Sequence, residues 1–222
     1  ISQLAKIFAK IQPDVVHTNT ISGFSPTVWY AARPFTKKVV HSLRDYYLLC
    51  PSTSMFKNGK TCSAQCVKCK ILSAPKRPQT SLVDHVVGNS QFILNKHLNA
   101  GLFKNSSSSY IYNAYKPEAH QPKEPSSIPV IGYIGRLART KGIDTLIDAT
   151  RLLTEKGLVF RVVIAGTGED AFLAELVSRA NGLPISFIGR AKPSEFFNSI
   201  TTTVVPSKWD EPLARVIFES FC

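Results

Sequence analysis

The chain has 222 residues, of which 44% are hydrophobic and 19% charged, a composition that fits a globular protein with one large or two small cores. No apolar run reaches the roughly 18–20 residues of a transmembrane helix, and no secretory signal opens the sequence. The net charge of +12 is uneven, because residues 1–125 hold 16 basic and 5 acidic side chains while residues 126–222 hold 11 and 10. We expect the basic half either to favour anionic partners or simply to be a solvated surface.

Along the first half of the chain, apolar runs predict helices that alternate with strands. Residues 1–11 already have helical spacing and Cys222 follows an apolar helix, so we expect both ends to be cuts in a longer chain. Further helices are predicted at 24–32 and at about 91–100. Strands are predicted at 15–17, 38–42, 84–87 and 109–112.

Two segments of the first half lack this periodicity. Residues 50–80 contain four of the 5 cysteines and are expected to be an insertion or a long loop. Residues 115–129 carry four prolines and form the predicted linker. The boundary is therefore placed so that residues 1–125 form one domain with a Cys-rich insertion, and residues 126–222 form a second domain.

The second half alternates strands and helices more regularly. Strands are predicted at 129–135, 160–165, 185–188 and 202–205. Helices are predicted from Ile143, over about 169–180, from Pro193 and over 213–221. Strands and helices at this pitch favour an α/β fold with a parallel, doubly wound sheet, whose ligands bind beyond the carboxyl ends of the strands. The loops expected to carry chemistry are 135–141, 166–169, 189–192 and 207–212.

The first of these loops combines glycine with two cations. Gly135 ends a predicted strand, Arg136 follows it, and Lys141 lies five residues further on, before a helix. Glycine lets a ligand approach the backbone, and two cations at the start of a helix suit a diphosphate. The alternative is that both are surface cations that flank a helix.

A pair of glutamates forms the second feature. Glu211 precedes Pro212 at the start of the last predicted helix, and Glu219 lies about two turns later. A carboxylate is a paired acceptor that suits the vicinal hydroxyls of a sugar or a ribose. Alternatively, Glu211 only caps the helix and Glu219 only pairs with Arg215 at i,i+4.

In chain order these motifs resemble a known enzyme family. The segments are Ile134-Gly-Arg-Leu, Lys141-Gly-Ile-Asp, Ala165-Gly-Thr-Gly, Phe187-Ile-Gly and Glu211-x7-Glu219. Together they resemble the donor domain of retaining glycosyltransferases of family 4. In the first half, Pro13-Asp-Val-Val-His17, Asp45-Tyr-Tyr-Leu-Leu-Cys-Pro51, Val86-Val-Gly-Asn-Ser90 and Ile111-Tyr-Asn113 resemble its acceptor-side landmarks. The resemblance implies the GT-B fold, in which two Rossmann-like parallel-sheet domains face each other, and at this length both domains would be incomplete.

The resemblance also implies roles for individual residues. Arg136 and Lys141 would hold the nucleotide diphosphate, Glu219 the ribose hydroxyls and Glu211 the transferred sugar. The backbone groups that approach the donor would be those of Gly135, Gly166, Gly168, Pro212 and Leu213. Members of the family need no metal for transfer, because the two cations take its place.

Several positions depart from the family pattern. Arg44 stands where a histidine is common, so either Arg44 or the neighbouring Asp45 would make the polar contact with the sugar, with His17 as a weaker candidate. Ala214 replaces a usual glycine, which narrows the approach to the phosphate. The Gly-rich loop expected near the amino terminus of a full enzyme is absent.

The cysteines carry two alternative interpretations. Cys50, Cys62, Cys66 and Cys69 follow a C-x11-C-x3-C-x2-C pattern, which could hold a tetrahedral structural zinc. The first spacing fits no standard zinc module, however, and the alternative is a set of reduced, partly buried thiols.

The leading hypothesis is a retaining transferase that moves a sugar from a nucleotide diphosphate donor to a saccharide or lipid-linked acceptor. It would act in the cytoplasm, and contact with the anionic inner face of a membrane is one alternative that we expect. The first alternative is a fragment that binds the nucleotide sugar without turnover. A basic nucleic-acid-binding protein is the second, although no nucleic-acid module is visible and no nucleic acid is expected as a partner.

Overall fold

A computed structural model describes residues 2–115 and 127–221 of the chain. The chain forms two compact units. Unit 1 consists of Ile1–Asn113 with Asp210–Leu213, and unit 2 consists of Ala114–Trp209 with Ala214–Cys222. The predicted boundary after residue 125 falls among residues 116–126, which lie outside the described residues.

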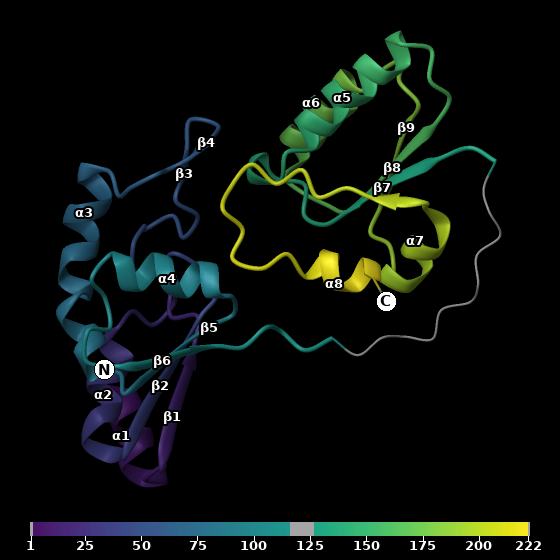
Figure 1. Ribbon diagram of the computed structural model, residues 1–222. Helices are drawn as coiled ribbons and strands as arrows, with labels where there is room; N and C mark the ends of the chain where they lie inside the picture. Colours follow the sequence, from purple (N-terminus) through teal and green to yellow (C-terminus); the bar gives the residue numbers. More distant parts are fainter. Residues whose placement is uncertain (1, 116–126, 222) are drawn as a thin grey trace. The chain divides into compact units, whose positions relative to one another are not determined.

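Unit 1 is built on a four-stranded parallel sheet in the order β1-β2-β5-β6. Its strands are β1 (Val15–Asn19), β2 (Lys38–Leu43), β5 (His85–Gly88) and β6 (Ser107–Tyr110). Its helices include α1 (Ser2–Ile11), α2 (Thr27–Ala32) and α4 (Gln91–Asn99). A crossover separates each pair of neighbouring strands, as parallel pairing requires, and Figure 1 shows this arrangement.

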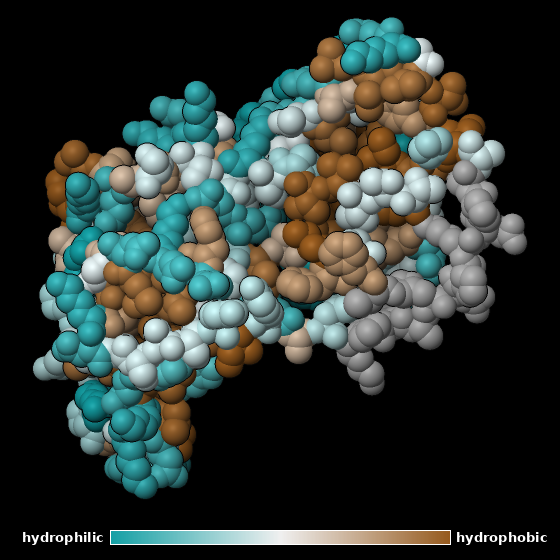
Figure 2. All heavy atoms as spheres, viewed as in Figure 1, coloured by the Kyte–Doolittle hydropathy of each residue, from teal (hydrophilic) through white to brown (hydrophobic). Residues whose placement is uncertain are grey.

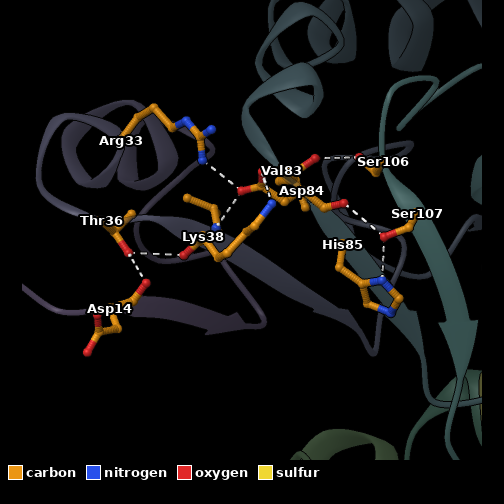
Figure 3. A network of polar contacts seen from close by, with 10 residues as sticks. Asp14, Arg33, Thr36, Lys38, Val83, Asp84, His85, Ser106 and Ser107 are labelled. Carbon is orange, nitrogen blue, oxygen red and sulfur yellow. Dashed lines mark hydrogen bonds and ion pairs between the residues drawn. The ribbon is translucent and has the colours of Figure 1, made fainter.

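A polar network holds the amino ends of the strands in unit 1. Asp84, directly before β5, accepts hydrogen bonds from the Val39 amide at 2.8 Å and from Arg33 at 2.7 Å, and Lys38 approaches at 3.4 Å. Burial opposes ionisation of Asp84, but the hydrogen bonds from Val39 and Arg33 outweigh it and hold its pKa below the usual range. In Figure 3 the Arg33 side chain points at the Asp84 carboxylate, while the Asp84 carbonyl faces Ser107. One carboxylate thus joins β2 to β5.

The segment predicted as an irregular insertion is more regular than expected. It contains an antiparallel pair, β3 (Phe56–Lys57) with β4 (Lys60–Thr61), and the helix α3 (Val67–Ser73). Short 3-10 turns follow at Arg33–Phe35 after α2, and at Ala74–Lys76 and Pro78–Leu82 after α3. The prediction of a loop missed α3 because its apolar side chains do not face a core: Val67 is 73% exposed and Ile71 66%.

Unit 2 also contains a four-stranded parallel sheet, in the order β10-β7-β8-β9. The strands are β7 (Val130–Ile134), β8 (Arg161–Ala165), β9 (Ile185–Gly189) and β10 (Thr202–Thr203). The helices are α5 (Ile143–Glu155), α6 (Asp170–Arg179), α7 (Pro193–Ser199) and α8 (Arg215–Phe221). Its core packs apolar residues of α5 and α6 on β8, among them Ile147, Leu176 and Ile164.

These sheets confirm the predicted α/β fold class with parallel sheets. Within residues 2–115 and 127–221, no helix is both long enough and apolar enough to cross a membrane. Figure 2 shows hydrophilic and hydrophobic side chains mixed over the visible face of each unit. The carboxyl ends of the two sheets are therefore the places to look for a binding site.

Candidate active site

A cavity of about 840 Å³ opens in unit 2, where β7, β8 and β9 end. Its lining includes Gly135, Arg136, Arg139, Gly166, Gly168 and Arg190. Three of the loops predicted to carry chemistry therefore meet in one cavity. This is the position in which open parallel sheets bind their ligands.

Glycines allow two of these loops to lie backbone against backbone. A Cβ on Gly166 would stand 1.8 Å from the carbonyl oxygen of Gly135, and Gly166 has a φ of +143°. A Cβ on Gly168 would stand 2.1 Å from the Leu137 oxygen. The Leu137 amide donates to the Thr167 carbonyl at 2.9 Å. The floor of the cavity is thus a rigid contact between two loops that no larger residue could form.

Three arginines supply positive charge to the cavity. Arg139 pairs with Glu175 at 2.7 Å and lies 4.7 Å above the centroid of the Phe172 ring. The hydrogen bond and the charge of Glu175 raise the pKa of Arg139. Among the described residues, Arg136 and Arg190 form no ion pair, and both are exposed. Two guanidinium groups therefore remain available to an anionic ligand.

Sequence reasoning placed Arg139 and Arg190 in loops expected to carry chemistry, 135–141 and 189–192, but did not single out either residue. Arg190 follows Gly189 at the end of β9, as Arg136 follows Gly135 after β7, so the same Gly-Arg signal was present in the sequence. Arg139 carried no such signal, because its place in the cavity depends on the 3-10 turn Arg139–Lys141.

Lys141 lies outside the lining of this cavity. Its Nζ is 5.9 Å from the centroid of the Trp209 ring. Gly142 has a left-handed φ of +70°, and a Cβ there would stand 1.9 Å from the Pro206 oxygen. The Lys208 amide donates to Thr140 at 2.8 Å. The turn that carries Lys141 is therefore fixed against residues 206–208.

Glu219 forms an ion pair with Arg215 in this structure. It lies on α8 and accepts a hydrogen bond from Arg215 at 2.9 Å, with 12% of its side chain exposed. It does not line the cavity. Its predicted contact with a ribose stays a prediction, and it requires Glu219 to exchange Arg215 for the ligand.

Three predicted donor-side residues, Glu211, Pro212 and Leu213, are grouped with unit 1 rather than with unit 2. Within unit 1, the Pro212 carbonyl accepts a hydrogen bond from Ser90 at 2.6 Å. Their predicted roles at a donor stay predictions.

The residues predicted on the acceptor side have separate tasks in unit 1. Asp45 accepts hydrogen bonds from Thr20 at 2.9 Å and from the Tyr47 amide at 2.8 Å, so it shapes the turn after β2, and Arg44 is exposed. His41, which was not among the predicted residues, is buried in the core, and burial lowers its pKa to about 3. A neutral core histidine is not available to a sugar.

The four central cysteines line one small cavity. The sulfurs of Cys50 and Cys69 are 3.7 Å apart, and the cysteines are free thiols. Burial, together with hydrogen bonds to Cys66 and Cys50, raises the pKa of the Cys69 thiol to about 12. In the described part of the chain, no group of three or more His, Cys, Asp or Glu side chains is placed to hold a metal ion. The structure therefore gives the predicted zinc site no direct support.

The sequence of unit 2 matches a known family. Residues 116–222 match the family model described as Glycosyl transferases group 1. The match covers the cavity and its three loops. It supports a glycosyltransferase domain in this half of the chain.

Relatives and solved structures agree with this match. A Klebsiella pneumoniae protein described as "Uncharacterized 42.6 kDa protein in cps region" is 32% identical over 220 residues, 98% of this chain and 57% of that protein. A glycogen synthase from Thermodesulfovibrio yellowstonii is 31% identical over 87 residues, 37% of this chain and 17% of that protein. The chain therefore spans little more than half of the first of these relatives.

Two solved structures share the fold. A TarM variant from S. aureus in complex with Fondaparinux, alpha-GlcNAc-glycerol and UDP has a TM-score of 0.70 at 16% identity, covering 98% of this chain and 42% of that chain. The pneumococcal O-GlcNAc transferase GtfA, in complex with UDP and GlcNAc, has a TM-score of 0.71 at 14% identity, covering 98% and 42%. These neighbours have the GT-B fold, so the two parallel sheets of this chain correspond to that architecture.

Proposed function

We propose that the protein transfers a sugar from a nucleotide diphosphate donor to a saccharide or lipid-linked acceptor, with retention of the anomeric configuration. The observation that carries this proposal is the 840 Å³ cavity of unit 2, lined by Arg136 and Arg190 at the ends of parallel strands. It lies within the residues that match the family model. A nucleotide sugar fits a cavity of this size, and its diphosphate calls for cations at this position.

In this proposal the arginines at the strand ends stabilise the departing diphosphate. Arg136 donates to the phosphate oxygens, and Arg190, which the sequence interpretation included only as part of loop 189–192, adds a second guanidinium. Lys141, held against residues 206–208, supplies a further charge when the donor is bound. No metal is needed for transfer, because these cations offset the charge that develops on the leaving group.

The remaining donor contacts follow from the family resemblance. Glu219 would leave Arg215 to bind the ribose hydroxyls, Glu211 would bind the transferred sugar, and the Leu213 amide would approach a phosphate. In the same resemblance, Arg44 or Asp45 would make a polar contact with the sugar. A carboxylate is suited to both hydroxyl contacts, because it offers paired acceptors to neighbouring donors.

Retention is proposed to occur by front-side displacement. The bond between the anomeric carbon and the diphosphate oxygen breaks, the acceptor oxygen bonds to the same face of that carbon, and the acceptor proton passes to the released diphosphate. Two carboxylates line the cavity, Glu169 and Glu175, and the second offers little support for double displacement because it is paired with Arg139.

The acceptor class is supported by the relatives and by charge. The Klebsiella pneumoniae relative is named for a cps region, and the TarM variant was solved with alpha-GlcNAc-glycerol. The excess of basic side chains in residues 1–125 suits an anionic or membrane-attached acceptor. We therefore place the protein in the synthesis of a cell-envelope polysaccharide.

Calorimetric titration of the full chain with UDP, ADP and GDP tests donor binding. Arg136→Ala is expected to weaken binding about 10- to 100-fold, since a charge-assisted hydrogen bond contributes ~1.5–3 kcal/mol. Arg161→Ala is the matched control, because Arg161 is exposed at the opposite end of the same sheet. Equal affinity in both variants, or no binding by the wild type, would contradict the proposal.

Turnover is measured separately, by release of the nucleoside diphosphate from each nucleotide sugar. Because the chain spans 57% of its Klebsiella relative, the second candidate function is nucleotide-sugar binding without transfer. Binding with release of diphosphate supports the transferase, and binding without release supports the second candidate.

A further inference from the structure

The cysteine segment of unit 1 plays no part in the proposed transfer. We propose that Cys50, Cys62, Cys66 and Cys69 bind one zinc ion, which cross-links the segment between β2 and α3. All four residues line a single cavity of about 10 Å³, which has room for an ion and for little else. This inference does not depend on the donor site, which lies in the other unit.

The spacing of two sulfurs fits zinc. Cys50 Sγ and Cys69 Sγ are 3.7 Å apart. In a tetrahedral site with Zn–S bonds of about 2.3 Å, neighbouring sulfurs are separated by about 3.8 Å. A disulfide would bring them to about 2 Å. Cys50 Sγ and Cys69 Sγ therefore already lie at the separation expected of two ligands of one tetrahedral zinc ion.

The backbone brings the other two ligands to the same cavity from different directions. The Cys62 amide donates to the Met55 carbonyl at 2.7 Å, which fixes Cys62 at the end of the β3–β4 pair. Cys66 is the N-cap residue of α3, with an extended backbone, and Cys69 lies in the first turn of that helix. As placed, no three His, Cys, Asp or Glu side chains among the described residues could hold a metal ion. The proposal therefore requires the cysteine side chains to turn toward one another when zinc binds.

The surrounding charge favours a dianionic zinc–thiolate centre. Between Tyr46 and Val83 the sequence has no Asp or Glu but has five Lys and one Arg. Lys76 is close enough to interact with Cys50 and Cys69, and Lys57 with Cys66. Lys76 is also held in place by a hydrogen bond to the Tyr47 carbonyl at 2.6 Å. Cations in these positions offset the two negative charges that four thiolates leave on a bound Zn²⁺.

The segment also needs a cross-link. Leu48, Leu49 and Met55 are buried, but residues 56–72 have no buried side chain. In that part the strands are two residues long and α3 leaves Val67 and Ile71 largely exposed, so burial provides little stability there. A zinc ion supplies that stability directly, because ligands gathered by the fold bind it together. The same segment walls a larger cavity of about 560 Å³, through Ser63, Gln65 and Lys70. Zinc would therefore also preserve the shape of this second cavity.

The test is the zinc content of the reduced full chain, purified without chelator and dialysed after incubation with zinc sulfate. Mass spectrometry of the metal is expected to find about one zinc per chain. Cys50→Ser and Cys69→Ser should each lower this at least tenfold at limiting zinc, and Cys222→Ser, the matched control, should retain it. Less than a tenth of an equivalent in the wild type, or full zinc content in both serine variants, would overturn the site.

A second measurement covers variants that fail to fold. Wild-type protein, stripped by chelator and titrated with Co²⁺, should develop the absorption of tetrahedral thiolate-bound cobalt, which zinc then removes. Chelation should increase amide hydrogen exchange in residues 50–73 while nucleotide binding by unit 2 stays unchanged. An intact Cys50–Cys69 disulfide in protein without metal would refute zinc binding in favour of a redox-active thiol pair.

Discussion

The two parallel sheets of this chain are fastened at opposite ends. In unit 1 a side chain holds the amino ends of the strands, where Asp84 joins β2 to β5. In unit 2 the backbone holds the carboxyl ends, where Gly135 and Gly166 bring two loops into direct contact. The comparison teaches that the same kind of parallel sheet can be held at the carboxyl ends of its strands, where ligands bind, or only at the opposite ends. In the second case the conformation of the ligand-binding end depends on its loops. Unit 2 has the stiffened edge, and its large cavity lies there.

The largest effect is expected from a substitution that forces apart the two backbone segments in contact in unit 2. Gly166→Ala puts a Cβ 1.8 Å from the Gly135 oxygen, so it should lower the free energy of unfolding by about 3 kcal/mol or more. Gly182→Ala is the control, because Gly182 has a φ of +75° but open space around it, and should cost only about 1 kcal/mol. Urea unfolding followed by fluorescence measures both. Equal losses would show that the contact does not stiffen this edge.

A smaller effect is expected at the amino ends of unit 1. Asp84→Asn removes the charge that Arg33 and Lys38 contact. It should lower the free energy of unfolding by about 2 kcal/mol at pH 7. Because the folded-state pKa of Asp84 is depressed, its contribution is present above the unfolded-state value of about 4 and is lost as the pH falls through the folded-state value. Hydrogen exchange at the β2 and β5 amides, measured from pH 7 to pH 3, should show the difference between variant and wild type shrinking. A constant difference would argue against the ion pairs.

The smallest effect is expected from the exposed pair at the rim of the unit 2 cavity. Glu175→Gln breaks the ion pair with Arg139, whose side chain is 69% exposed. Solvent screens such a pair, so the unfolding midpoint should not change measurably. Nucleotide binding should strengthen slightly, because Arg139 is then released toward the cavity. A clear loss of stability would mean that side chains as well as backbone fasten this edge.

The sequence predicted the strands of both sheets and most of their helices, because β-branched runs and helical apolar spacing are local signals. Residues 130–134 and 161–165 show this in unit 2. It did not predict α3, whose apolar side chains face solvent. Nor did it predict the role of Asp84, which depends on β2 and β5 being neighbours although about 45 residues separate them.

The candidate site was predictable to a similar degree. Gly135, Arg136, Gly166 and Gly168 meet in one cavity, as strand-end positions in a parallel sheet should. Arg190 carried the same signal but was not singled out. Glu219 was not resolved by spacing alone, because a glutamate four residues after Arg215 suits an ion pair as well as a ligand. Local sequence shows which groups are present, but their partners are set by tertiary structure.

The left-handed Gly142 has a consequence for the order in which this protein matures. Its backbone rests on the Pro206 oxygen, so the turn that carries Lys141 is shaped by residues that the ribosome adds more than sixty positions later. Strands β7 and β8 and helix α5 can assemble while synthesis continues, but this turn acquires its final conformation only after residue 208 has emerged. A nascent chain stopped earlier would hold most of the sheet and lack a correctly placed Lys141.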